Sequence, residues 1–191
     1  MSRGCTPTVS GRRWNILHDR RKRAARVSRF KRLRGGRLQA TLDPTEVDLL
    51  RALPKELRGL YEADDEDDPV HERLFPRAYL DPTQEEAEAE WQALVHPELL
   101  RERMDALELI ATSLERGTEH RSKIRVELSE DETQAWLGVL NDARLALGTR
   151  LGVAEDTDYT RLDPEDPDAA TYAAYMWLTE LQGDLVETLM G

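Results

Sequence analysis

A run of hydrogen-bonding side chains interrupts the apolar pattern of residues 129–149. Asn141 and Arg144 are three positions apart, a spacing that places both on one face of a helix. Asp142 adds a carboxylate, and Arg150 lies near the end of the same helix, where the helix dipole favours a cation. These groups can bind a polar partner, or they can form an internal hydrogen-bond network with a neighbouring helix. We keep both interpretations.

Residue patterns typical of catalytic and metal sites are not present. The chain has four histidines, His18, His71, His96 and His120. None has the H-x-x-x-H or E-x-x-H spacing that puts two ligands on one helix face. There is no G-x-S-x-G sequence, Cys5 is the one thiol, and Gly148 and Gly152 match no phosphate-binding loop. We predict no catalytic residues, no metal and no cofactor, with an enzyme of unknown type that uses Asn141 and Arg144 as an alternative.

Charge divides the chain into two parts. Residues 1–40 hold 13 Lys and Arg against one acid, Asp19, and the remaining residues carry a net charge of −23. A basic segment can bind nucleic acid by displacing counterions from phosphates, or it can be a disordered tail. Residues 1–27 lack apolar periodicity, so we predict a disordered basic extension there and a single globular domain over residues 28–191. A start at Val27 is another interpretation of this segment.

Two acidic segments, residues 62–68 and 155–168, are expected to be solvated loops or surfaces that attract a basic partner. No apolar run approaches the roughly 20 residues of a membrane helix, and no apolar stretch follows the basic N-terminus. We therefore predict a cytoplasmic protein with no membrane association. Because the chain has one cysteine, no disulfide can form within it.

The periodicity of apolar residues predicts an α+β fold that is predominantly α-helical. Residues 28–33 and 37–42 flank Gly35-Gly36, a pair suited to a hairpin turn. Residues 123–128 alternate polar and apolar side chains, the pattern of a half-buried strand. We expect this hairpin and the later strand to form a small antiparallel sheet that packs with about five helices.

Apolar stripes and capping residues define the helices. They are expected over about residues 44–61, 82–95, 97–116, 130–149 and 169–190, with a short amphipathic segment at 70–79. Asp43 with Glu46, and Ser129 with Glu132, have the spacing of capping boxes. Each pair therefore predicts the start of a helix at the residue after the cap.

Prolines and glycines add expectations about these helices. Pro54 should kink or divide the first helix, and His96-Pro97 should separate two helices into a jointed arm. Gly117 should adopt the left-handed conformation that commonly ends a helix. Gly183 costs about 1 kcal/mol in a helix relative to alanine, so we expect a neighbouring helix to approach it closely.

Two tryptophans should belong to the core. Trp136 and Trp177 each lie beside the apolar stripe of a helix. Such a stripe has to be covered by a neighbour, and the natural neighbours are these two helices themselves. We therefore expect both indole rings to be largely buried.

Two stretches are more specific than amphipathic helices in general. They are residues 140–152, LNDARLALGTRLG, and residues 175–182, YMWLTELQ, which Leu185-Val186-Glu187 follows. With the hairpin before Asp43, they resemble the actinobacterial domain-of-unknown-function 2017 family in the same order. The resemblance covers about residues 28–190. Gln182, in the second stretch, completes the candidate binding residues, which are Asn141, Asp142, Arg144, Arg150 and Gln182.

The resemblance implies a short protein without an assigned enzymatic activity, and some members are described as transcriptional regulators. Genes of this family tend to lie near a Clp-protease adaptor gene and near sulfur-carrier and cysteine-synthesis genes, which implies regulation linked to proteolysis or sulfur metabolism. Our leading hypothesis is a non-enzymatic regulatory or adaptor protein that binds an unidentified protein partner through its acidic helical surface. The first alternative is a DNA-binding transcriptional regulator that contacts DNA through the basic N-terminal segment and the hairpin.

Overall fold

The computed structural model describes residues 28–63, 68–154 and 166–191. Within them the chain forms four β-strands, five α-helices and two short 3-10 turns. The predicted α+β fold with a predominance of helix is therefore confirmed. The disordered extension predicted over residues 1–27 lies outside the described residues, as do parts of both acidic segments.

The strands form one small antiparallel sheet. β1 (Phe30–Arg32) and β2 (Leu38–Leu42) are the predicted hairpin, and β4 (Lys123–Leu128) is the predicted later strand. The strand order is β1-β2-β4-β3. The sequence does not predict β3 (Thr118–His120), because its three residues are all exposed and show no alternation of polar and apolar side chains.

Both hairpin turns use backbone with positive φ. Gly35 and Gly36 have φ angles of 74° and 75° in the turn η1 (Arg34–Gly36), in agreement with the prediction from this glycine pair. In the β3–β4 turn, Arg121 and Ser122 have φ angles of 48° and 60°. The sheet therefore ends in two tight loops, and each loop carries at least one arginine.

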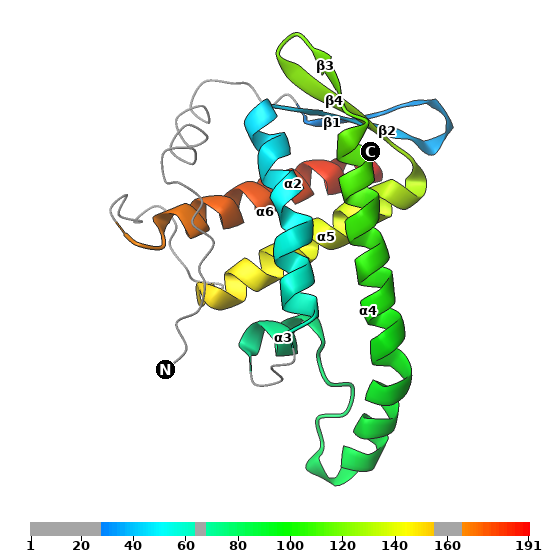
Figure 1. Cartoon of the computed structure of the whole chain (residues 1–191), viewed down its shortest axis with the longest axis vertical. Helices are drawn as coiled ribbons and strands as arrows, with labels where there is room; N and C mark the ends of the chain where they lie inside the picture. The colour runs from blue at the N-terminus through cyan, green and yellow to red at the C-terminus, as the bar shows by residue number, and fades with distance from the viewer. Residues whose placement is uncertain (1–27, 64–67, 155–165) are drawn as a thin grey trace.

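Capping boxes begin two helices where the sequence predicts them. α2 (Pro44–Tyr61) and α5 (Glu130–Arg150) both start immediately after the cap residue. The Glu46 and Glu132 carboxylates each accept a hydrogen bond of 2.9 Å from the N–H of their cap residue. Pro54 lies inside α2 but does not divide it, so α2 is one helix that runs from beside the sheet to the part of the body next to α3 (Figure 1).

α4 (Glu85–Glu115) is one continuous helix of 31 residues, so the predicted break at His96-Pro97 is wrong. Pro97 lacks the N–H that would bond to the carbonyl of Ala93, but both residues are exposed, and water can hydrate that carbonyl. The turn η2 (Pro82–Gln84) leads into α4. Figure 1 shows that the first half of α4 projects away from the body.

The projecting part of the chain begins after α3 (Pro69–Leu74) and includes η2 and the first half of α4. We call residues 76–96 the helical arm. It lies at the end of the molecule opposite the sheet (Figure 1). The chain thus has a sheet at one end, a helical arm at the other and a helical body between them.

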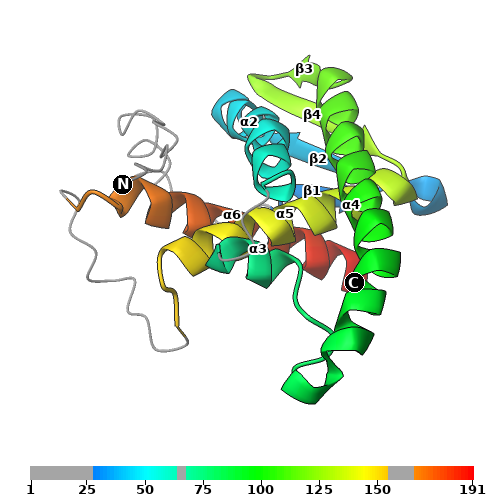
Figure 2. The ribbon, with the colours of Figure 1, turned by 60° about the horizontal axis from the view of Figure 1, so that its bottom comes forward.

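The core lies between the inward face of the sheet and the helices. α5 is central and contacts α3, α4, α6 (Ala169–Met190) and β4 (Figure 2). Trp136 is fully buried, its ring meets Phe30 edge-on at 6.2 Å, and its indole N–H donates to the Ser113 hydroxyl at 2.9 Å. Trp177 is 4% exposed. The prediction that both tryptophans are buried is therefore confirmed.

Two expectations about glycines are wrong. Gly117 does not have positive φ; a Cβ at this position would lie 2.7 Å from Cγ2 of Ile124, so the missing side chain permits close packing of the end of α4 against β4. Gly183 is exposed, and no atom of another described element lies within 4 Å of the position of its Cβ. No neighbouring helix therefore approaches Gly183.

Candidate functional site

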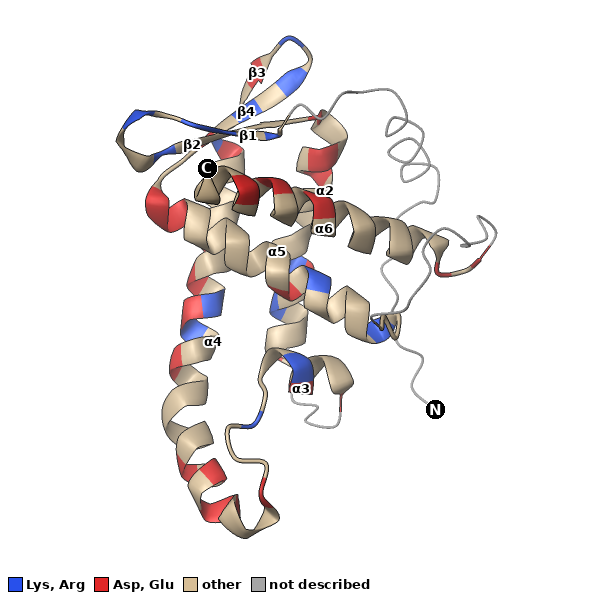
Figure 3. Cartoon of the chain, turned by 180° about the vertical axis from the view of Figure 1, so that it is seen from behind, with Lys and Arg blue, Asp and Glu red and all other residues tan. Residues whose placement is uncertain are grey.

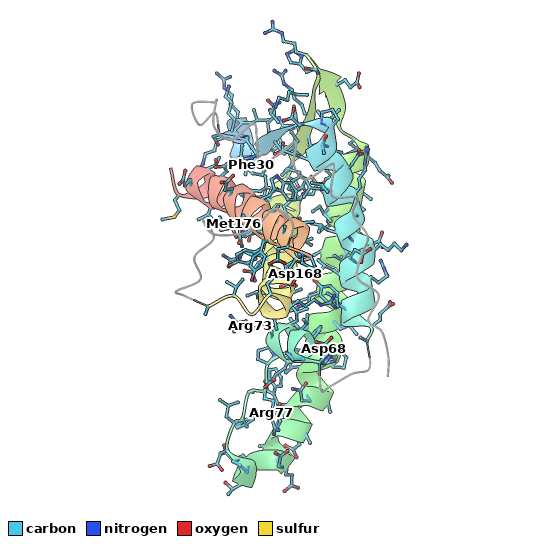
Figure 4. All side chains as sticks on the ribbon, turned by 90° about the vertical axis from the view of Figure 1, so that its left-hand side faces the viewer. Phe30, Asp68, Arg73, Arg77, Asp168 and Met176 are labelled. Carbon is cyan, nitrogen blue, oxygen red and sulfur yellow. The ribbon has the colours of Figure 1, made fainter. Side chains whose placement is uncertain are left out.

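A groove of about 960 Å³ lies where the helical arm leaves the body. Its lining comes from three segments: the end of α2, the region of α3, and α4 up to Leu100. Arg77, labelled in Figure 4, belongs to this lining. The volume is in the range of ligand sites in proteins. The described lining residues combine aromatic and apolar side chains with His, Glu and Arg, and they include no Ser, Thr or Cys.

Three rings in mutual contact, tilted against one another, form one wall of the groove. The ring centroid of Phe75 lies 5.0 Å from that of His71 and 4.7 Å from that of His96. The Arg103 guanidinium lies 4.5 Å from the Phe75 centroid, within cation–π distance. Phe75 is buried, whereas both histidines are partly exposed. The wall therefore presents two imidazole rings on a fixed apolar support.

A buried polar cluster holds this wall from behind. The Tyr61 hydroxyl donates to Asp142 at 2.7 Å, and Nη1 of Arg103 lies 3.5 Å from the same carboxylate. Burial raises the pKa of Asp142, although Arg103 and the Tyr61 hydroxyl both act to lower it. Burial, with the nearby carboxylate of Asp142, also raises the pKa of Tyr61. The cluster joins α2, α4 and α5 and keeps Arg103 against Phe75.

Glu88 fixes the two sides of the helical arm to each other. Its carboxylate accepts hydrogen bonds from the N–H groups of Tyr79, at 2.8 Å, and Ala78, at 3.1 Å. The Gln92 side chain also donates to it at 2.8 Å. The bond from Tyr79 is the main reason that the pKa of Glu88 is lowered. Glu88 is thus a buried acid whose role in the helical arm is structural.

Acidic side chains also lie along the rim. Glu85 forms an ion pair with Arg77, with 2.8 Å between Oε1 and Nη2. Glu62 and Glu72 are exposed and have no ion pair within 4 Å in the described part of the chain. Two carboxylates therefore remain available to a positively charged group that enters the groove.

The structure separates the five residues that the sequence nominates for binding. Gln182 donates a hydrogen bond of 3.5 Å to Asn141, where α5 meets α6. Asp142, one position along α5, belongs to the buried cluster behind the groove, and a hydrogen bond with the Asn141 side chain also acts to lower its pKa. The binding role of these residues stays a prediction.

The two arginines of that set lie elsewhere. Arg144 lines a second hollow, of about 530 Å³, together with Arg73 of α3, which Figure 4 labels, and Tyr175 of α6. Nε of Arg144 is buried and has no hydrogen-bond partner among the described residues. Arg150 is exposed at the end of α5. None of the five lines the large groove, and Asp142 alone belongs to the cluster behind its wall.

Sequence reasoning missed most of the groove because three distant segments build it. Phe75 belongs to the amphipathic segment after the first acidic run, and His96 was interpreted as part of a helix junction. Tyr61 continues the apolar stripe of α2 four residues after Leu57, which indicates burial but not a partner for its hydroxyl. Only tertiary packing brings Asp142 to that hydroxyl.

The described residues contain no group of three or more His, Cys, Asp or Glu side chains placed to hold a metal ion. His71 and His96 are accounted for by their ring contacts with Phe75. Among the helices of the described segments, none is both long and apolar enough to cross a membrane.

Comparison with known proteins links the chain to one family and to named regulators. The family model described as "domain of unknown function (DUF2017)" matches residues 26–189. A Mycobacterium tuberculosis protein named oxidative stress regulator AosR is 32% identical, with 97% of this chain and 99% of that protein covered. A Mycobacterium bovis protein of the same name is similar to the same extent. No solved structure matches the chain.

Proposed function

The chain belongs to the DUF2017 family, and on that premise we propose that it is a non-enzymatic regulatory protein that binds another protein in the groove. The mycobacterial relatives are named oxidative stress regulators, which supports a regulatory role. The observation that carries the proposal is the groove between α3 and α4, with its ring-lined wall and acidic rim. A buried cluster holds this wall in place before any partner arrives.

The lining defines the chemistry of the partner. Glu62 and Glu72 would meet Lys or Arg side chains of a basic segment. The rings of His71, Phe75 and His96 would contact an apolar or aromatic side chain, the kind of residue that dominates the centre of protein interfaces. The occupant is therefore a basic peptide segment with at least one large apolar residue.

The helical arm beside the groove carries exposed apolar side chains. Leu80 is 83% exposed, Leu94 is 78% exposed and Tyr79 is 37% exposed. A protein partner that covers them would bury an apolar surface next to the groove. They extend the proposed interface from the groove onto the helical arm.

A disulfide within the chain cannot be the regulatory step. The sequence has a single cysteine, Cys5, which lies outside the described residues. If the chain shares a role in oxidative stress with the relatives, its response has to pass through a partner or through a thiol that reacts outside the chain. The identity of the partner would also decide the predicted links to transcription, Clp proteolysis or sulfur metabolism.

Photo-crosslinking from the groove tests the proposal. A benzoylphenylalanine at Gln92, which lines the groove, should capture a defined protein in cells of the source organism. The same residue at Glu56, exposed on α2, serves as the matched position outside the groove. Mass spectrometry of the adducts identifies the partner.

Charge reversal then tests whether the captured protein contacts the acidic side chains at the rim of the groove. Glu62→Arg/Glu72→Arg should lower the yield from Gln92 at least about tenfold, because like charges placed opposite each other cost several kcal/mol. Glu56→Arg/Glu102→Arg, an equal change of charge at exposed positions outside the lining, should leave the yield unchanged. Equal capture by both double variants would contradict a partner bound in the groove.

A further inference from the structure

We propose that the outward face of the sheet binds the phosphate backbone of nucleic acid. We call residues 28–42 and 118–128 the sheet end. They hold eight basic and two acidic side chains, a net charge of +6, whereas the rest of residues 28–191 carries −24. Figure 3 shows Lys and Arg on both hairpins of the sheet and acidic side chains along the helices. The positive charge is therefore concentrated at one end of an acidic protein.

The strand register puts these cations on the side away from the core. Ala40 and Val126 are opposite each other and fully buried, so their neighbours along each strand point outward. Lys31 lies opposite Gln39. Arg125 lies between Thr41 on β2 and Thr118 on β3. The outward face thus carries cations and short polar side chains, together with the acid Glu127 opposite Gln39.

Some of these cations are engaged within the protein. Arg29 pairs with Glu46 and Asp184, and Arg32 donates to carbonyls at the end of α6. Arg37 pairs with Glu127 at 3.1 Å, and Lys123 pairs with Asp43 at 2.9 Å. These residues hold the sheet together and to the helices. Their charges are therefore used in contacts within the protein.

The other cations are not engaged in this way. Lys31, Arg34 and Arg121 are exposed and form no ion pair with any described residue. Arg125 is partly exposed and forms no ion pair with any described residue. A guanidinium in such a position can meet an anionic oxygen atom. Four cations spread over two hairpins fit a partner with repeated phosphates.

The character of the surface distinguishes nucleic acid from an acidic protein. Protein interfaces have an apolar centre. Four large apolar side chains are exposed in the described residues. Three lie on the helical arm, and the fourth, Met190, follows the α6 carbonyls that Arg32 contacts, so the sheet end borders a single exposed apolar side chain and not an apolar patch. Phosphate contacts need no apolar centre, and Gln39, Thr41 and Thr118 can add hydrogen bonds to the backbone.

The acidic body does not prevent such binding. Charges are screened over about 8 Å at physiological ionic strength, so most acidic side chains on the helical arm and the far side of the body contribute little at the sheet face. The basic residues of segment 1–27 join the chain immediately before β1 and would add to the attraction.

Fluorescence anisotropy with a labelled duplex of arbitrary sequence tests the proposal on the full chain. With about four phosphate contacts, the affinity should fall roughly 100-fold between about 50 mM and about 200 mM NaCl. Lys31→Glu/Arg34→Glu should weaken binding at least about tenfold at the lower salt and reduce the salt slope by about two. Arg51→Glu/Lys55→Glu, the same change of charge at exposed positions of α2, should stay within about threefold of the parent.

The outcomes separate the sheet face from the N-terminal segment. Arg12→Glu/Arg13→Glu changes only the N-terminal segment and leaves the charges of the sheet in place. If duplex affinity falls in this variant but Lys31→Glu/Arg34→Glu binds as tightly as the α2 control, the proposal is overturned. A parent chain that does not bind duplex at the lower salt would overturn it too, and would favour an acidic protein as the partner of this face. Circular dichroism of each variant verifies that the fold is retained.

Discussion

The two ends of the molecule differ in charge and in the exposure of apolar side chains. The sheet end carries exposed cations and no strongly exposed large apolar residue. The helical arm carries exposed leucines beside a groove with free carboxylates and a wall of rings. The first combination suits a polyanion, and the second suits a basic protein segment. One chain therefore has the surfaces to connect two partners of different class.

The helix α2 connects both ends. Near its start, Glu46 accepts hydrogen bonds from Arg29, ahead of β1, and from the indole of Trp177. At its end, Tyr61 donates to Asp142 behind the groove. Fifteen residues of helix separate Glu46 from Tyr61, about 22 Å at 1.5 Å per residue. This exceeds two screening lengths at physiological salt, so the charges of the two ends act independently while the backbone holds them at a fixed distance.

Trp177→Ala should have the largest effect on stability. It should destabilise the sheet end and the groove together, because both pack on one core. Truncation of a buried aromatic side chain costs roughly 3–5 kcal/mol. Trp177 is buried and also donates to Glu46, at 3.1 Å. The free energy of unfolding, measured in urea by circular dichroism, should fall by this amount in a single transition.

A second variant keeps this test interpretable if the first does not fold. Trp177→Phe retains most of the apolar volume and loses one N–H donor to Glu46, which keeps its bonds from Arg29 and Asp43. It should therefore cost about 1.5–3 kcal/mol at most, the range for one hydrogen bond to a charged group. If Trp177→Ala is as stable as the parent, the assignment of α6 to the common core is wrong. Two separate transitions would show that the sheet end and the groove are independent units.

Arg103→Met should have an intermediate effect that depends on pH. Burial raises the pKa of Asp142 in the folded protein, so the ionised carboxylate costs stability at neutral pH, and this cost disappears as the pH falls below the ordinary pKa of aspartate. Arg103 reduces the cost, since its charge lowers that pKa. Loss of the cation should therefore destabilise the fold by about 1–3 kcal/mol at pH 7 and by less at about pH 4.

Arg101→Met is the matched control for this prediction. Arg101 is on the same helix, but its side chain is 59% exposed and its carboxylate partners are also exposed. Exposed pairs contribute about 0–1 kcal/mol, so this variant should change little at either pH. An Arg103→Met loss that is equal at both pH values would show that Arg103 acts by packing on Phe75 and not through Asp142.

The sequence predicts local features better than the places where distant segments meet. The hairpin at Gly35-Gly36 and the capping box of Ser129 and Glu132 were predictable because each depends on residues close together in the chain. The break at Pro97 was wrongly predicted, because one lost hydrogen bond at an exposed position does not end a long helix.

The site was less predictable for the same physical reason. The contact between Asn141 and Gln182 crosses two helices that the sequence pairs correctly. The groove depends on how α3 and the segment after it pack beside α4. The periodicity of apolar residues gives no information about that packing. His71 and His96 meet Phe75 only in the folded chain.

The smallest expected effects concern two glycines, one beside the sheet end and one away from both ends. Gly183→Ala should stabilise the protein by about 0.5–1 kcal/mol, because the position is an exposed helix interior with open space around the new Cβ. Gly117→Ala should have the opposite sign, since its Cβ would lie 2.7 Å from Ile124 and force the end of α4 away from β4. Urea unfolding of both variants measures the signs. A stabilising Gly117→Ala would mean that the junction between α4 and the sheet is loose, and the two ends would then not be held at a fixed distance.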